Sequence, residues 1–479
     1  MIARMRGLGF SALLLYGLFV PGGRIGAQAL APPSQGTPQN APVHLTAEQD
    51  RRRMLDLLGI KELRPEKSSN AKAPNGANYD EAKANQYPNL PDPLTFNDSG
   101  RVTTAAQWWT RRRPEIVKLF NDNVLGRAPE NLPSVKWETV SSASEDYEGF
   151  PVTTTRLAGH VDNAAYPQIG VTIDVELTLP ANAKGPVPVI IELAFASDFA
   201  RAVARPVSND PGNYAVRWQP VLKRGWGFAV LNPASFQADD GAGLTAGIIG
   251  LMNKGQPRGV EDWGALRAWA WGAGRFLDYL ATLPAVDAKR VGIEGHSRFG
   301  KAALVTMAYD RRFAIAYISS SGEGGAKLYR HIFGEPIMNV ASVSEYHWMA
   351  GSFLQYAGPL TPGDLPVDNH ELIALCAPRP VFIGGGASVG DGYADPSGDG
   401  WADSRGMFLA EVAASPVYEL LGVQGLGASE FPPVGTALTA GELGFRQHPG
   451  GHSPAPNWPA FLDFADKHLR EAGSRSPGM

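Results

Sequence analysis

Hydrophobic and polar positions follow two different patterns along this chain, and the change between them falls near residue 185. Before it, alternating or β-branched positions predict antiparallel strands at 135–140, 152–157 and 170–179. After it, short and nearly continuous apolar runs predict strands that are buried on both faces of a parallel sheet. These runs are 187–193, 227–232, 290–295, 314–318 and 380–384.

Segments with apolar residues at helical spacing separate these strands. The strongest is 262–283, and further helices are predicted at 46–58, 103–125, 406–412 and 459–472. Strands that alternate with helices indicate an α/β fold, a three-layer sandwich with a mostly parallel, doubly wound sheet and antiparallel N-terminal edge strands. The segments 198–214 and 240–258 are expected to be loops near the functional site.

The segment 291–301 joins a buried strand to a helix and reads Val-Gly-Ile-Glu-Gly-His-Ser-Arg-Phe-Gly-Lys. Ser297 therefore lies on a tight strand-to-helix turn with glycines close by, the arrangement of a nucleophile elbow. The turn would present the Ser297 hydroxyl to a base and direct the N–H of Arg298 at the developing oxyanion. Together with the antiparallel first strands, this predicts an α/β-hydrolase architecture.

Two histidines near the C-terminal end are candidates for the base, because the order in this fold is Ser, acid, His. We prefer His452, since Gly450 and Gly451 before it let the backbone bend over the nucleophile. His448 is the alternative, and we expect one of the two histidines to be a solvent-facing residue of the loop. His296 is expected to point to the other side of the turn.

The acid is expected in the loop after the strand at 380–384, which contains a local duplication at 390–395 and 398–403. Counting from the strand favours Asp391, and counting back from the next helix favours Asp399. We take Asp391 as the acid and keep Asp399 as the alternative. Asp-Gly pairs also form turns, and a calcium-binding loop is a further possibility.

The segment 295–301 resembles the Gly-x-Ser-Arg-x-Gly-Lys motif of bacterial glucuronoyl esterases. This family cleaves esters between lignin alcohols and the 4-O-methyl-glucuronic acid groups of xylan. The resemblance spans roughly residues 100 to 470. Further similar segments are 321–325, 345–348, 365–370, 377–380, 401–403 and 450–452.

The resemblance implies Ser297 as nucleophile, His452 as base and Arg298 as the residue that stabilises the oxyanion through its backbone and guanidinium. It also implies a sugar pocket lined by Lys301, Glu345, Trp348 and Trp401. Such a pocket suits a uronate ester, whose hydroxyls need hydrogen-bond partners and whose ring face stacks on an aromatic side chain.

The chain departs from the family in two places. Many members have the acid where this chain has Ser320, so an acid after the later strand must serve. Glu323, nearby, ranks below both aspartates. A glutamine that contacts the sugar in fungal members is replaced by an apolar residue near Ile337 or Met338, which leaves the sugar specificity open.

With 479 residues, 44% of them hydrophobic and 19% charged, the chain has the composition of an ordinary globular protein. A net charge of −4 provides no basic surface, so no nucleic-acid partner is expected. The single cysteine, Cys376, excludes a disulfide within the chain. No metal-ligand spacing occurs, and no cofactor is predicted.

Residues 1–29 combine arginines, a short apolar stretch and an Ala-x-Ala site, the features of a secretory signal peptide. We expect 30–100 to be a disordered lead-in followed by wrapping chain, and 101–473 to be the α/β-hydrolase catalytic domain. The protein would be periplasmic or secreted, a monomer, and without a membrane partner after signal removal. An uncleaved anchor is the alternative.

These observations predict a secreted serine carboxylic-ester hydrolase that cleaves 4-O-methyl-glucuronic acid esters of glucuronoxylan through an acyl-enzyme. One alternative is an acetyl-xylan or other small-acyl esterase on the same scaffold. The other is an inactive relative that only binds carbohydrate.

Overall fold

The computed structural model describes residues 41–204, 214–387 and 398–471. The described residues form one compact unit, so the segment from 41 to 100 belongs with the predicted catalytic domain. The predicted signal peptide and the lead-in up to residue 40 lie outside the described residues. None of the described helices combines the length and hydrophobicity that crossing a membrane requires.

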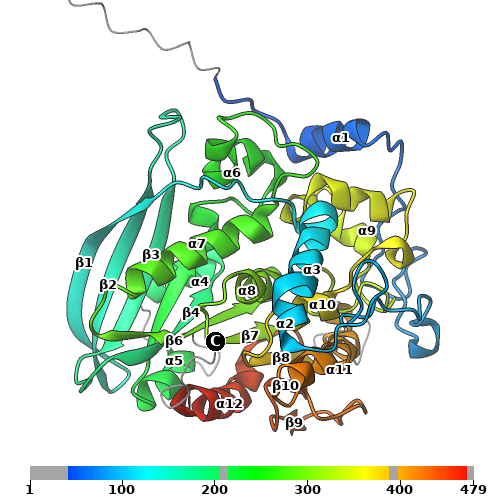
Figure 1. Ribbon diagram of the computed structural model, residues 1–479. Coiled ribbons are helices and arrows are strands. Elements are labelled where there is room, and N and C mark those ends of the chain that lie inside the picture. Colours follow the sequence, from blue (N-terminus) through cyan, green and yellow to red (C-terminus); the bar gives the residue numbers. More distant parts are fainter. Residues whose placement is uncertain (1–40, 205–213, 388–397, 472–479) are drawn as a thin grey trace, which may run out of the picture. The chain divides into compact units, whose positions relative to one another are not determined.

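A sheet forms the middle layer of this unit and has ten strands among the described residues, in the order β1-β2-β3-β5-β4-β6-β7-β8-β10-β9 (Figure 1). They are β1 (Val135–Tyr147), β2 (Phe150–Val161), β3 (Thr172–Pro180), β4 (Val187–Leu193), β5 (Gly227–Asn232), β6 (Val286–His296), β7 (Ile315–Ser319), β8 (Val381–Gly386), β9 (Ala437–Leu438) and β10 (Leu443–His448). Pairing is antiparallel from β1 to β5 and parallel from β5 to β10. This confirms the predicted α/β-hydrolase sheet with antiparallel N-terminal edge strands.

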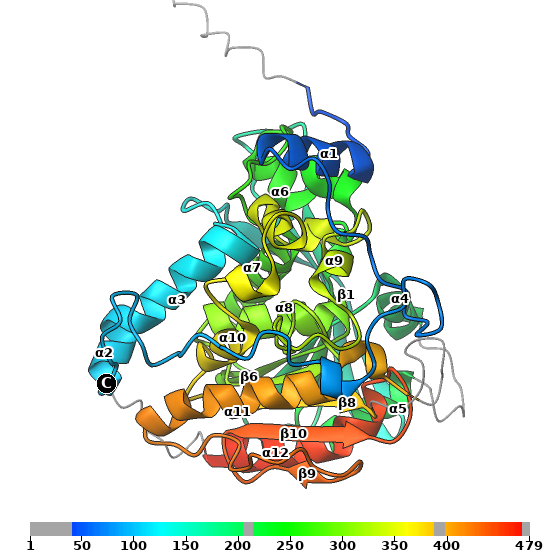
Figure 2. The same ribbon diagram turned by 90° about the vertical axis from the view of Figure 1, so that its right-hand side faces the viewer.

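Helices cover both faces of the sheet. They are α1 (Ala47–Leu57), α2 (Ala105–Gln107), α3 (Arg113–Phe120), α4 (Ala196–Ala204), α5 (Tyr214–Lys223), α6 (Gly247–Met252), α7 (Ala265–Leu280), α8 (Arg298–Tyr309), α9 (Ile337–Val340), α10 (Asn369–Ala374), α11 (Ser404–Leu420) and α12 (Trp458–Glu471). α7, α8 and α11 pack on one face, and α5 and α12 pack on the other. Figure 2 shows α11 and α12 on opposite sides of β10.

Alternate residues of the central strands enter two separate cores, as the pleat of a strand requires. In β7, Ala316 and Ile318 join the large core beneath α7, α8 and α11. Ile315 and Tyr317 join the smaller core on the side of α5 and α12. All four are fully buried. This burial on both faces explains why the central strands read as continuous apolar runs.

The helix predicted at 103–125 forms, but it is not a regular α-helix. α2 and α3 are joined by a π-helical turn at Trp108–Arg112, and a second π turn at Asn121–Leu125 ends the helical segment. Pro114 lacks the N–H that a regular α-helix would donate to Thr110, which favours a wider turn there. A second difference is that residues 196–204 form α4 instead of a loop.

The chain between α1 and α2 has little regular structure and runs across the unit on the outside (Figure 2). It is attached by backbone hydrogen bonds, such as 2.8 Å from Arg64 N–H to the Ala357 carbonyl and 2.9 Å from Gly334 N–H to the Asn78 carbonyl. Its Glu81 carboxylate lies 3.2 Å from Nε2 of His331. This segment therefore supports the loop 331–336, which leads into the site described below.

Candidate active site

Ser297 lies between the end of β6 and the first turn of α8, in a backbone conformation that side-chain-bearing residues rarely adopt. Its φ is 58° and its ψ is −127°. The turn is held by a 2.9 Å hydrogen bond from Ser297 N–H to the Ser319 carbonyl. A Cβ at Gly295 would lie 2.1 Å from the Phe299 carbonyl oxygen, so only glycine permits this approach of strand and helix. Strain held by its surroundings is typical of a nucleophile elbow.

His452 lies in the loop after β10 and is oriented by a buried aspartate. Its Nδ1 is 2.8 Å from Oδ1 of Asp399. The other oxygen, Oδ2, accepts hydrogen bonds from the Ser320 hydroxyl at 2.6 Å and the Gly386 N–H at 3.1 Å. Asp399 is 2% exposed. A buried carboxylate with its acceptors occupied in this way fixes the imidazole ring and its tautomer.

The partner of His452 is therefore Asp399, the aspartate that we kept as the alternative. Asp391 lies outside the described residues. The Asp399 N–H donates to the Ala387 carbonyl at 2.7 Å, which brings the chain back to the end of β8. Counting residues from the strand favoured Asp391 because a count cannot detect this return of the loop.

Ser320 stands at the position where the resemblance implies an acid in many members, and its hydroxyl donates to Asp399. It follows β7 directly, with a φ of 42°, and its N–H donates to the Gly384 carbonyl at 2.7 Å. The residue after β7 thus helps to orient Asp399, which in turn contacts His452. Glu323, which ranked lower, forms an ion pair with Lys327, and burial raises its pKa to about 8.

Two expectations about histidines are wrong. His448 does not face solvent: it is 1% exposed, and its Nε2 donates to the Gly451 carbonyl at 3.0 Å, which shapes the loop that carries His452. Burial lowers the pKa of His448 and keeps it neutral. His296 does not point away from the base, because its ring centroid lies 4.3 Å from that of His452. Its Nδ1 is 3.1 Å from the Ser319 hydroxyl.

A cavity of about 290 Å³ opens beside the elbow. It is lined by Ser297, Arg298, Lys301, Ser320, Ser321, Gly322, Glu335, Glu345, Trp348, Trp401, Ala402 and His452. The structure thus brings together all the sequence-predicted site residues that it describes. Neither Ile337 nor Met338 belongs to the lining. Among the described residues, no group of His, Cys, Asp and Glu side chains is arranged to hold a metal ion.

Two glutamates face Lys301 and Arg298 in the cavity. The buried Lys301 ammonium donates to the Glu335 carboxylate at 3.1 Å and to the Glu323 carbonyl at 2.5 Å. Burial, and then the charge of Glu335, raise the pKa of Glu345 to about 8. Oε2 of Glu345 has no hydrogen-bond partner among the described residues. The cavity therefore offers a carboxyl group, that of Glu345, which is neutral at pH 7.

Glu335 and Asp239 were not among the residues predicted from the sequence. Asp239 accepts a hydrogen bond from the Arg298 guanidinium at 2.7 Å. It lies one residue before the segment 240–258, which was expected to be a loop near the site, and that was the only sequence signal for it. Glu335 follows Gly334 and precedes Pro336 without a recognisable motif.

An elbow serine with a His after β10 and an Asp after β8 defines an α/β-hydrolase. The family model described as glucuronyl esterase of fungi matches residues 258–422. A carbohydrate esterase of an unknown prokaryotic organism is 33% identical over 83% of this chain and 93% of its own length. The 4-O-methyl-glucuronoyl methylesterase of Schizophyllum commune is 30% identical over 78% of this chain and 79% of its own length.

A solved structure is similar as well. The glucuronoyl esterase from Teredinibacter turnerae T7901 superposes with a TM-score of 0.80 and 42% sequence identity, and the match covers 88% of this chain and 99% of that one. The chain belongs to the glucuronoyl esterase family, carbohydrate esterase family 15.

Proposed function

We propose that this protein hydrolyses esters of 4-O-methyl-glucuronic acid, of the kind that link lignin alcohols to xylan, by a serine mechanism. The observation that carries the proposal is one cavity that holds Ser297 and His452 beside Lys301, Glu345 and aromatic side chains. These are the groups needed to attack an ester and to hold the sugar that carries it.

The reaction follows from the contacts of each residue. Asp399 occupies Nδ1 of His452, so the other ring nitrogen accepts the proton of Ser297 as its oxygen attacks the ester carbonyl. The oxyanion meets the N–H of Arg298 at the N-terminus of α8 and the Arg298 guanidinium. His452 then protonates the departing alcohol, and water releases the uronic acid from the acyl-enzyme.

The sugar is held by three kinds of group: an ammonium, a neutral carboxyl and an aromatic ring. Lys301 is already held by Glu335 and can donate to a sugar hydroxyl without moving. Glu345, neutral at pH 7, can donate as well as accept. Trp401 supplies an aromatic face at the cavity. The pocket therefore favours a ring with several hydroxyls over a small acyl group.

A substrate comparison with Lys301→Ala tests this assignment. For a benzyl glucuronate ester we expect kcat/KM to fall by about tenfold or more, because a buried charged donor is lost. For a phenyl acetate ester the change should be less than about threefold, since an acetyl group has no hydroxyl to bind. The ratio of the two rates in one preparation does not depend on how much protein is folded.

Wild-type enzyme and the Lys301→Gln variant, which keeps a donor, serve as references, and a galacturonate ester shows how far the pocket reads the sugar. The small-acyl esterase would be favoured if Lys301→Ala lowered kcat/KM equally for the glucuronate and acetate esters, or if the wild-type enzyme hydrolysed the acetate ester faster than the glucuronate ester.

The protonation state of Glu345 makes sugar binding depend on pH. The pKa of Glu345 is about 8, so at a lower pH the carboxyl is neutral and can donate a hydrogen bond. At a higher pH the carboxyl ionises, which removes the donor and adds a negative charge beside Glu335. We therefore expect KM for a glucuronate ester to rise by several-fold from about pH 7 to about pH 9. In Glu345→Gln, which cannot ionise, KM should stay level over the same range. A wild-type KM that is level would contradict this role.

We also propose that residues 1–29 direct export, that 101–473 form the catalytic domain with the segment 41–100 packed onto it, and that the protein acts as a monomer. The signal-like N-terminal sequence and the location of plant cell-wall polymers outside the cell support export. The single compact unit from residue 40 onward supports one catalytic domain.

A further inference from the structure

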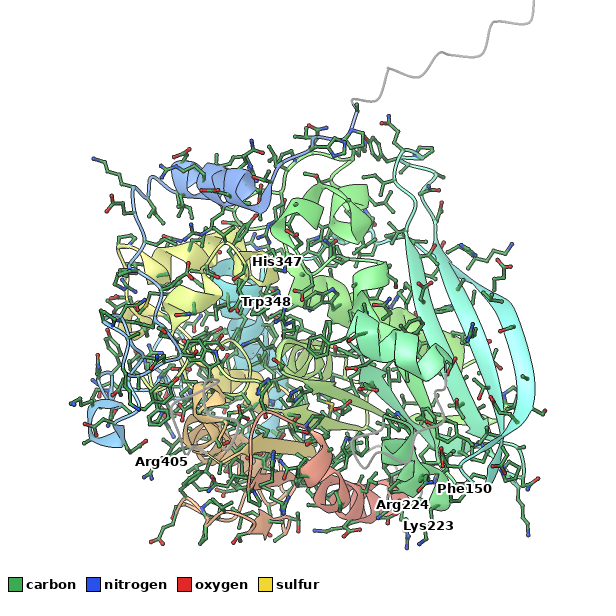
Figure 3. The ribbon with its side chains drawn as sticks, turned by 180° about the vertical axis from the view of Figure 1, so that it is seen from behind. Phe150, Lys223, Arg224, His347, Trp348 and Arg405 are labelled. Carbon is green, nitrogen blue, oxygen red and sulfur yellow. The ribbon has the colours of Figure 1, made fainter. Side chains whose placement is uncertain are left out.

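Asp239 follows β5 and gathers three donors around one carboxylate. Its Oδ2 accepts from Nη1 of Arg298 at 2.7 Å. Its Oδ1 accepts from Nε1 of Trp348 at 2.7 Å and from Nε2 of His347 at 3.0 Å. Figure 3 shows His347 and Trp348 close together in this region of the fold. One side chain therefore connects the oxyanion arginine to a wall of the cavity.

The carboxylate of Asp239 is charged at any pH at which the enzyme would work. Burial alone would raise its pKa, but the hydrogen bond from His347 and the charge of Arg298 outweigh it and lower the pKa to about 2. Burial lowers the pKa of His347 below its usual value, so this histidine is neutral and acts as an N–H donor. Because His347 is neutral, the negative charge of Asp239 is paired with the positive charge of Arg298.

Arg298 needs such an anchor. Its side chain is 36% exposed, and a long exposed side chain samples many rotamers when nothing holds it. Asp239 is its only ion-pair partner among the described residues. The aromatic rings of Trp348 and Phe195 lie 5.2 and 5.8 Å from the guanidinium carbon, close enough to limit its motion but not to set its direction.

The anchored guanidinium keeps a donor free for the reaction. Asp239 takes only Nη1, and the guanidinium carries further N–H donors. Arg298 also lines the cavity beside Ser297. A donor of the anchored guanidinium can therefore serve an oxyanion at Ser297.

We propose that Asp239 is a positioning residue of this esterase: it holds the Arg298 guanidinium in the orientation that stabilises the oxyanion and ties it to Trp348. This rests on the proposed role of Arg298. Asp239 itself does not touch the reacting atoms. Its effect comes from preorganisation, because an arginine that must be ordered during the reaction stabilises the transition state less.

Asp239→Asn tests the proposal, since the amide keeps the size and can still accept from Trp348 but loses the charge. We expect kcat for a benzyl glucuronate ester to fall by about tenfold or more, with KM changed by less than about threefold. Asp240→Asn is the matched control: Asp240 is exposed and its carboxylate only caps a short helix at the Ala242 N–H, which asparagine also does. Its kcat should stay at the wild-type level, and melting temperatures should show that both variants fold.

A double-mutant cycle separates positioning from a general effect. In an Arg298→Ala background, Asp239→Asn should reduce kcat by less than about twofold, because the group that it orients is gone. An equal loss in both backgrounds, or an unchanged kcat in Asp239→Asn alone, would overturn the proposal. If Arg298→Ala itself keeps full activity, the assigned role of Arg298 fails instead.

Discussion

Replacing Ser297 by alanine is expected to reduce hydrolysis of a benzyl or methyl glucuronate ester by about 10³-fold or more. The elbow places this hydroxyl at the cavity that His452 also lines. Of the two other serines that line the cavity, the Ser320 hydroxyl donates to Asp399 and the Ser321 hydroxyl donates to the sulfur of Met407. Alanine has no greater difficulty than serine with a φ of 58°, so the fold should persist. Initial rates and a thermal melt measure the two effects separately.

Ser344→Ala is a suitable comparison, because Ser344 is exposed and lies outside the cavity. It should keep wild-type activity. Covalent labelling by an organophosphonate adds a second readout: wild-type protein should gain one label and Ser297→Ala none. Undiminished turnover in Ser297→Ala would refute the serine mechanism, and wild-type protein that neither turns over nor takes the label would favour an inactive carbohydrate-binding relative.

Asp399→Asn is expected to lower kcat by roughly 10²- to 10⁴-fold with little change in KM. The asparagine amide cannot provide two acceptors, so the Nδ1–H of His452 loses its partner and the imidazole can adopt the wrong tautomer. The Ser320 hydroxyl can rotate to donate to the remaining oxygen, which limits the structural damage.

Asp391→Asn distinguishes the two aspartates of the duplicated loop. We expect its kcat to lie within about twofold of the wild-type value, because the position facing Nδ1 is filled by Asp399. The reverse pattern, a large loss in Asp391→Asn and none in Asp399→Asn, would return the role to Asp391. Both variants should be compared at the pH of maximal wild-type rate.

The features that could be predicted from the sequence are those with a local cause. The parallel strands were recognisable because strands buried on both faces must be apolar at every position, as in β4 and β7. Ser297 was recognisable because an elbow needs glycine at Gly295 and a helix directly after it. The glycines before His452 marked the base in the same way. The π turns around α3 had no such pattern.

The remaining features depend on contacts between distant parts of the chain. Asp391 and Asp399 have nearly the same local sequence, and only the backbone hydrogen bond from Asp399 to Ala387, at the end of β8, places Asp399 on the imidazole. Asp239 and Arg298 are 59 residues apart, and Lys301 and Glu335 are 34 apart. His296 and His448 were misplaced because side-chain direction in a turn depends on which neighbours pack against it.

The amino-acid sequence alone was thus sufficient to predict the type of sheet and to single out the candidate nucleophile and base. Periodicity and turn chemistry act over a few neighbouring positions, so they can be recognised in the sequence. The choice of acid, the anchoring of Arg298 and the charge of the sugar pocket were decided only by the folded chain. Hydrogen bonds and burial act over a few ångströms in space, whatever the separation in sequence.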